Sequence, residues 1–207
     1  MPTNRIEAFS DGVFAIAVTL LVLEIRLPEH DGSLTERLGD AWPAYVAYGI
    51  SFVTLGIMWA NHHTIFSLID RSSHGLVVAN LLLLLCVAFL PFPTSVLGEH
   101  LQGSDAEQHT AVVFYGASFA VTAAFYNVLW QTAAWRNRLI APGAEAQAEQ
   151  VTRSYRYGVP VYALAAVVGF WSVPLSLAID GALAFLYILP QRDPADDPSR
   201  EGARRRD

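Results

Sequence analysis

The chain has 207 residues, of which 53% are hydrophobic and 15% are charged, a composition too apolar for a typical soluble domain of this length. Its formal net charge of -6 argues against a nucleic-acid partner, because phosphate contacts need a clustered basic surface. Cys86 is the single cysteine, so the sequence excludes a disulfide framework and a cysteine-based metal cluster. These features indicate a membrane protein.

Six stretches are apolar enough to predict membrane-spanning helices, which need about 20 residues each and must satisfy their own backbone hydrogen bonds. In chain order they cover residues 9–27, 42–69, 75–97, 110–133, 157–171 and 172–189. We interpret the first as a retained helix, since the pattern of a cleaved signal peptide is missing. Pro91 and Pro93 should end or kink the third helix, and Pro174 marks a break between the last two.

Arginine is the only basic residue type, and its distribution predicts the topology. Eleven arginines fall on one side of a six-span arrangement, and only Arg26 and Arg37 fall on the other. We therefore expect a multi-pass protein of the cell membrane with both termini in the cytoplasm. Residues 1–190 form one transmembrane domain in this prediction, and residues 191–207 form a disordered cytoplasmic tail.

The outer loops are predicted to be acidic. Eight acidic residues and two arginines on that side leave a charge of -6 per chain. Around a shared symmetry axis this charge would concentrate cations at an external mouth. Ordinary solvated loops are an equally good interpretation.

The first segment carries an aliphatic stripe and a polar beginning. Ile16, Leu20 and Leu23 recur at i, i+4 and i+7 and share one helix face, with Thr19 beside them. Ser10 and Asp11 point roughly 120° and 140° away from that face, toward neighbouring helices. A stripe with this spacing more often packs inside a subunit than lines a pore, so the spacing alone does not assign its role.

A second polar group, residues 61–63, occurs at a depth similar to that of the polar beginning of the first helix. A carboxylate at membrane depth requires hydrogen-bond donors, so we expect Asp11 to find them among Arg5 and residues 61–63. The expected members of this structural polar network are Arg5, Ser10, Asp11, Asn61, His62 and His63.

Other chemistries fit these residues less well. His62 and His63 are adjacent and lack the i, i+4 spacing of a helical zinc pair, so we expect no metal site. Ser10, Asp11 and His62 could form a catalytic triad, but Ser10 lacks the glycine pattern of a nucleophile elbow, which argues against intramembrane hydrolysis. We expect no enzymatic activity and no cofactor. Asp180 lies near the middle of the last span, where a helix-to-helix hydrogen bond is favoured over a proton or cation relay.

The opening pattern Arg5-x-x-x-Phe9-Ser10-Asp11-Gly12-Val13-Phe14-Ala15-Ile16-Ala17-x-Thr19-Leu20-Leu21-x-Leu23 resembles the signature of the transmembrane protein 175 family. That family comprises the endolysosomal potassium channels and their prokaryotic relatives. The segment from Trp59 to His63 is similar to the family's second helix. The resemblance covers the membrane portion of the chain and excludes the outer loops and the tail after Pro190.

The resemblance implies an all-α homotetramer with six transmembrane helices per subunit, whose four first helices line a central pore. Position by position, Ile16 falls at the narrowest hydrophobic constriction, Leu20 and Leu23 at the next pore-facing layers, and Thr19 at a position implicated in selectivity. The sequence contains no TVGYG-like filter. The implied function is a potassium-preferring cation channel in the lipid bilayer, with K⁺ as its permeant ion and a gate at Ile16.

The residues by themselves leave two alternative functions open. A proton-coupled secondary transporter would use Asp11, Asp180 and the histidine pair as titrating relays, although the internal repeats common in such proteins are not evident. A membrane-embedded sensor or assembly protein without ion flux would be favoured if the purified protein were monomeric.

Overall fold

The computed structural model describes residues 3–29, 31–135 and 139–188. Within them the chain is helical, and the β pairing they contain is one isolated antiparallel bridge between Ile69 and Ile140. The elements in chain order are α1 (Thr3–Leu20), the 3₁₀ helix η1 (Leu21–Glu24), α2 (Leu34–Asp40), α3 (Trp42–Ser67), α4 (His74–Phe89), α5 (Pro91–His100), α6 (Asp105–Ala134), α7 (Glu145–Val168) and α8 (Val173–Ile188). The predicted all-α class is therefore correct.

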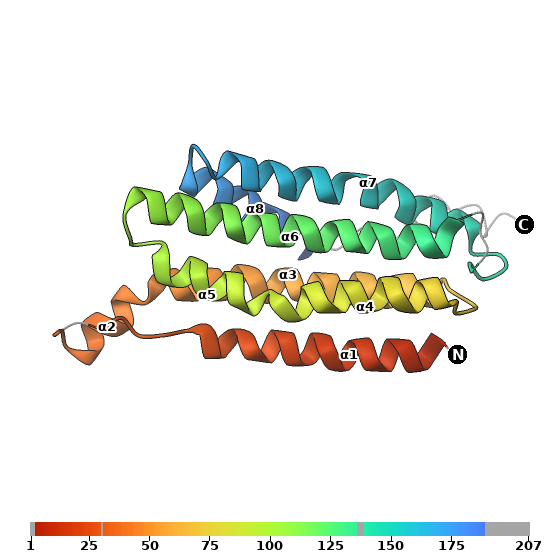
Figure 1. Ribbon diagram of the computed structural model, residues 1–207, viewed down its shortest axis with the longest axis horizontal. Coiled ribbons are helices and arrows are strands. Elements are labelled where there is room, and N and C mark those ends of the chain that lie inside the picture. Colours follow the sequence, from red (N-terminus) through yellow and green to blue (C-terminus); the bar gives the residue numbers. More distant parts are fainter. Residues whose placement is uncertain (1–2, 30, 136–138, 189–207) are drawn as a thin grey trace, which may run out of the picture.

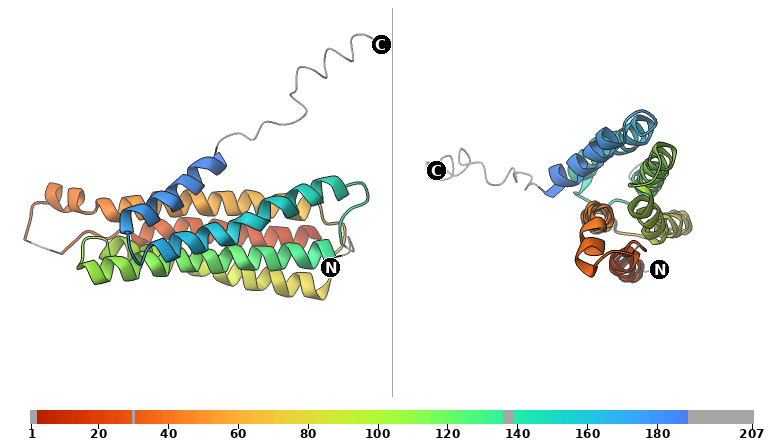
Figure 2. Two further views of the ribbon diagram at one scale, coloured as in Figure 1. Left: turned by 90° about the horizontal axis from the view of Figure 1, so that it is seen from above. Right: turned by 90° about the vertical axis from the view of Figure 1, so that its left-hand side faces the viewer.

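The long helices run nearly side by side, and α1 lies at one edge of the bundle (Figure 1). It packs on α3 and α4, while η1 extends it onto α5. On the other side of the molecule α7 packs along α6, and α8 crosses back obliquely toward α3 (Figure 2). One face of α1 is consequently covered by its own subunit, and the opposite face is left open.

Four helical segments of the described chain are long and apolar enough to cross a membrane: Thr3–Glu24, Trp42–Ser67, His74–His100 and Asp105–Ala134. The fifth and sixth predicted spans correspond to α7 and α8. Helix α7 begins at Glu145, twelve residues before the predicted start, and its first half is polar. Helix α8 has 16 residues and contributes a shorter apolar stretch, Val173–Phe185. The structure therefore supports a membrane protein, while six membrane crossings remain a prediction.

Prolines mark the helix breaks that the sequence predicts. Helix α4 ends at Phe89 and α5 begins at Pro91, where the missing N–H of proline interrupts the hydrogen-bond ladder. Helix α8 begins at Val173, with Pro174 in its first turn, where an unpaired backbone donor is normal. Both boundaries are confirmed.

Large side chains and close helix contacts hold the bundle together. Phe14, Tyr115, Phe119 and Trp130 are among the largest fully buried side chains. Helices α6 and α7 approach closely at Gly116, because a Cβ atom there would lie 3.0 Å from the Cα atom of Ala166. Small residues at such crossings allow the van der Waals packing that drives helix association in lipid.

The loops that the topology prediction assigns to opposite sides of the membrane lie at opposite ends of the bundle. The start of α1 and the α3–α4 loop, which contains Arg71, lie at one end (Figure 1). The segment with α2 and the end of α5 lie at the other end, where Arg26 pairs with Glu99 at 3.2 Å. The predicted disordered tail, residues 191–207, lies outside the described residues.

Candidate functional site

The uncovered face of α1 contains the aliphatic stripe. Ile16, Leu20 and Leu23 have 61%, 40% and 67% of their surface exposed, although each is a large apolar side chain. Thr19 is exposed on the same face, and its hydroxyl donates a hydrogen bond of 2.9 Å to the carbonyl oxygen of Ile16. The structure therefore brings all four predicted pore positions to one surface.

Small residues continue this exposed face toward the start of α1. Ala8, Gly12 and Ala15 are exposed there, and no atom lies within 4 Å of a Cβ atom built at Gly12. Small residues spaced by four positions let helix backbones approach one another closely in a membrane. This surface has the composition of a helix that meets other helices.

The covered face of α1 is held by a buried chain of hydrogen bonds across three helices. Asn80 on α4 accepts from His62 Nε2 at 2.8 Å and donates through Nδ2 to Ser10 Oγ at 2.9 Å. Ser10 in turn donates to the carbonyl oxygen of Ile6 at 2.8 Å. Because Asn80 Oδ1 only accepts, the bonded nitrogen of His62 must carry the hydrogen. The other ring nitrogen, Nδ1, is buried and has no partner among the described residues, which fits a neutral imidazole.

Two further polar contacts join α1 to α3. The indole Nε1 of Trp59 donates to Asp11 Oδ1 at 2.9 Å. His63 Nδ1 lies 2.6 Å from Glu7 Oε1. Together with the buried chain, these contacts fix the rotation of α1, so that its aliphatic stripe faces away from the subunit.

The membership of the predicted network needs correction. Asp11 does form a hydrogen bond with α3, the helix that carries the second polar group. Its donor is Trp59 rather than His62, His63, Asn61 or Arg5. Asn61 instead lines a pocket with residues of α6 and α7, such as Tyr126. The guanidinium of Arg5 is exposed at the start of α1, and the described residues provide it with no hydrogen-bond or ion-pair partner. The reason is the rotation of α3, which turns Trp59 toward α1 and Asn61 away from it.

Asn80 is the residue that sequence reasoning missed. It is the only strongly polar side chain within the apolar stretch of α4, and it is buried. A polar residue at membrane depth is costly unless it is bonded, and this rule could have identified it.

Asp180 also departs from expectation. It is buried on α8, and neither carboxyl oxygen has a hydrogen-bond partner among the described residues. The favoured helix-to-helix hydrogen bond is therefore not formed.

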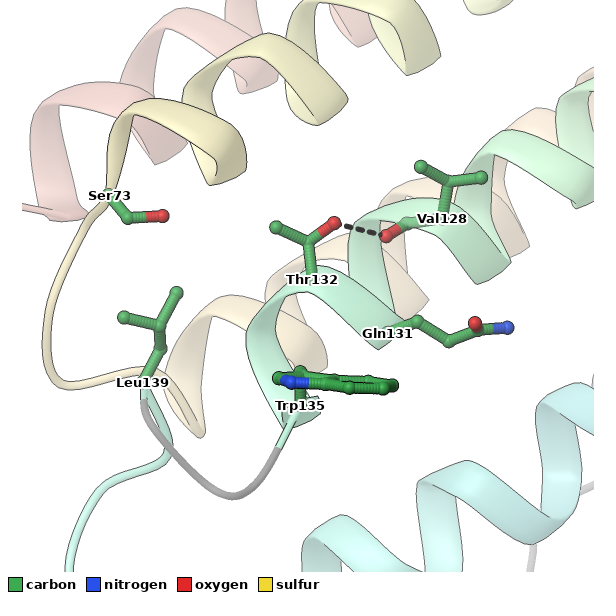
Figure 3. A pocket seen from close by; sticks show the side chains of 6 residues that line it. All are labelled: Ser73, Val128, Gln131, Thr132, Trp135 and Leu139. Carbon is green, nitrogen blue, oxygen red and sulfur yellow. Dashed lines mark hydrogen bonds between the residues drawn. The ribbon is translucent and has the colours of Figure 1, made fainter.

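A metal centre and a pocket are the other kinds of site that the structure could offer. In the described ranges, no three His, Cys, Asp or Glu side chains are grouped so that they could hold a metal ion. A pocket of about 560 Å³ opens between the start of α4 and the end of α6 (Figure 3). It is lined by Ser73, Val128, Gln131, Thr132, Trp135 and Leu139. The candidate site is thus an open helix face rather than a cavity within the subunit.

Comparison with known proteins decides the family. The model of the family described as endosomal/lysosomal potassium channel TMEM175 matches residues 5–91. A potassium channel of Chamaesiphon minutus is 43% identical over 192 residues, which cover 90% of this chain and 94% of that relative. The chain belongs to the TMEM175 family. A potassium channel of Streptomyces collinus is 41% identical over 204 residues, covering 97% of each chain.

Solved structures and animal relatives extend this result. The crystal structure of a lysosomal potassium-selective channel TMEM175 homolog from Chamaesiphon minutus matches with a TM-score of 0.82 and 41% identity, over 90% of this chain and 96% of that chain. The chicken (Gallus gallus) endosomal/lysosomal proton channel TMEM175 is 34% identical over 147 residues, covering 66% of this chain and 28% of the relative. The resemblance seen in the opening motif is confirmed, and the chain is a membrane ion channel rather than an enzyme.

Proposed function

We propose that this TMEM175 family member is a potassium-preferring cation channel, in which the exposed faces of α1 from four copies line a shared pore. The observation that carries the proposal is the exposure of Ile16, Leu20 and Leu23 on a helix segment whose opposite face is packed in its subunit. Relatives named as potassium channels over nearly the whole chain support the choice of ion.

The chemistry of the exposed face favours a hydrophobic constriction. A ring of Ile16 side chains around an axis would exclude water and so close the pore, and widening the ring would restore conduction. K⁺ holds its hydration shell less strongly than Na⁺ and would pass such a ring more readily. Aliphatic side chains offer no ordered oxygens in place of that shell, so the potassium preference should be modest.

Thr19 adds a polar contribution next to the constriction. Its hydroxyl hydrogen is already donated to the Ile16 carbonyl, so the lone pairs of Oγ1 remain available. An oxygen in this state can accept part of the coordination of a passing cation. We therefore assign Thr19 to selectivity and Ile16 to gating.

The polar network has a structural role in this proposal. The bonds from Asn80 to Ser10 and from Trp59 to Asp11 connect the covered face of α1 to two different helices. Without them α1 could rotate about its axis and withdraw the aliphatic stripe from the pore. We propose that the channel lies in the cell membrane with both termini in the cytoplasm, because arginine is concentrated on that side of the predicted topology.

A bi-ionic measurement tests the function directly. Purified protein is reconstituted into planar bilayers with K⁺ on one side and an equal concentration of Na⁺ on the other. The proposal predicts that the reversal potential is displaced from zero toward the equilibrium potential of K⁺. A reversal potential at zero would reject potassium preference, and the absence of cation current would reject the channel.

Proton conduction is a second candidate, because the animal relatives are named as proton channels. A pH gradient imposed across the same bilayers, with K⁺ equal on both sides, would shift the reversal potential if protons dominate the current. Potassium flux into liposomes without a proton gradient, at rates far above those of a carrier, would also exclude a proton-coupled transporter.

A further inference from the structure

Asp180 occupies an unusual position in the subunit. It lies seven residues after the start of α8, about 10 Å along a helix of 16 residues. Only 3% of its surface is exposed, and neither carboxyl oxygen is hydrogen-bonded within the described ranges. An ionised carboxylate in an apolar interior is costly unless donors or a cation surround it.

Within the part of the chain that the structure describes, Asp180 has neither an ion-pair partner nor a nearby charge of opposite sign. Helix α8 packs on α3, α6 and α7. A Cβ atom at the adjacent Gly181 would lie 3.9 Å from Ile50 Cδ1, which places this part of α8 against α3. The Tyr115 phenol on α6 is close enough to Asp180 to interact with it electrostatically.

Tyr115 ends a chain of hydroxyl groups whose direction can be deduced. Thr94 Oγ1 donates to the carbonyl oxygen of Leu90 at 2.9 Å, since a carbonyl oxygen can only accept. The hydrogen of Thr94 is therefore used, and Ser51 must donate to Thr94 across their 2.8 Å contact. The hydrogen of Ser51 is then used as well, so Tyr115 must donate to Ser51 at 2.9 Å.

This direction determines what the hydroxyl chain can offer to a carboxyl group. All three hydroxyl hydrogens point away from Tyr115, toward Leu90. The oxygen of Tyr115 keeps a lone pair and can accept one more hydrogen bond. The cluster thus has no free hydrogen for an ionised carboxylate, but it has an acceptor for a carboxylic acid.

We propose that Asp180 is a proton-binding site inside each subunit, where the protonated carboxyl donates to the Tyr115 oxygen through one water molecule. The site goes beyond the proposed function, because neither residue lies on the exposed face of α1. On release, the O–H bond of the carboxyl breaks and the proton passes to water, leaving an unpaired carboxylate among α3, α6 and α8. Proton loss should therefore loosen the packing of α8.

Infrared difference spectroscopy of the purified full-length channel tests the proton directly. We expect a carboxylic-acid C=O band at neutral pH that shifts in D₂O and disappears in the Asp180→Asn variant. The Glu149→Gln variant serves as the control, because the Glu149 carboxyl is exposed and pairs with Arg153 at 2.6 Å. A wild-type spectrum without such a band from pH 5 to 8, or a band that persists in Asp180→Asn, would overturn the proposal.

The role of Tyr115 is tested by comparing two buried tyrosines of α6. Tyr115→Phe removes the acceptor and should shift the Asp180 band. Tyr126→Phe should leave the band in place, because the Tyr126 phenol donates to the Met58 carbonyl and its ring packs against Tyr155. Equal band positions in wild type and Tyr115→Phe would remove Tyr115 from the site.

Thermal unfolding provides a readout that does not depend on ion flux. As the pH rises toward the titration of Asp180 in the folded state, the wild-type midpoint should fall by several degrees, since the unfolded chain releases this proton at lower pH than the folded state does. Asp180→Asn has no proton to lose, so its midpoint should not follow this fall. Parallel pH profiles in the two proteins would contradict the inference, whereas a missing potassium preference in bilayers would contradict only the proposed function.

Discussion

Replacing Asn80 by leucine tests the buried network that orients α1. The substitution preserves approximate size and removes two hydrogen bonds at once, from His62 Nε2 and to Ser10 Oγ. It also leaves the N–H of His62 buried without an acceptor. We expect a clear loss of stability, because unsatisfied buried groups are costly where water is excluded.

The magnitude follows from the bonds that are lost. Hydrogen bonds between membrane helices contribute on average about 0.6 kcal/mol and at most about 1.7 kcal/mol each. Two bonds therefore give a loss of about 1 to 3 kcal/mol in the free energy of unfolding. The leucine side chain recovers some apolar packing, so the lower half of this range is expected.

Thermal unfolding of detergent-solubilised Asn80→Leu, followed with wild type under identical conditions, measures the effect. Asn127→Leu is the matched control, because the hydrogen bond of the Asn127 amide among the described residues goes to the Ala123 carbonyl of its own helix at 3.1 Å. We expect a lower midpoint for Asn80→Leu and little change for Asn127→Leu. Equal midpoints in both variants would refute the assignment of the network as the anchor of α1.

Four other substitutions test three separate parts of the structure. Ile16→Asn should hydrate the constriction, raising single-channel conductance and lowering potassium preference; unchanged currents would reject Ile16 as the gate. Asp11→Ala and Trp59→Phe break the same bond, so each should lower stability by about 0.6 kcal/mol and the double variant by little more; fully additive losses would show that the two side chains act independently. Gly116→Val places a Cβ atom 3.0 Å from the Ala166 Cα atom and should destabilise the protein by about 1 to 3 kcal/mol in thermal unfolding; an unchanged midpoint would mean that α6 and α7 separate without cost.

Helical periodicity was sufficient to predict the arrangement of α1. The spacing of Ile16, Leu20 and Leu23 placed them on one face, and the angular offset of Ser10 placed it on another. The structure exposes the first group and buries Ser10. Periodicity succeeds here because α1 has an aliphatic side and a side with polar contacts, so the pattern distinguishes its two faces.

Periodicity failed for the partners of α1 because the polar residues of α3 and α4 do not gather on one side of either helix. No pattern in such helices reveals which side faces a neighbour, so the sequence could not show that Trp59 rather than Asn61 meets Asp11. Asn80 was overlooked for a related reason, since it lies within a leucine-rich run. The boundaries of α7 were also misplaced, because its polar first half continues the helix beyond any apolar segment.

Cysteine accessibility tests most directly whether the exposed face of α1 lines the ion path. In a Cys86→Ser background, Leu20→Cys and Leu23→Cys are reconstituted and treated with a small cationic thiol reagent. Leu85→Cys is the control, because Leu85 lies on α4 and 68% of its surface is exposed. We predict that the reagent reduces potassium current at both α1 positions and not at Leu85. Block at Leu85 with no effect at either α1 position would contradict the account.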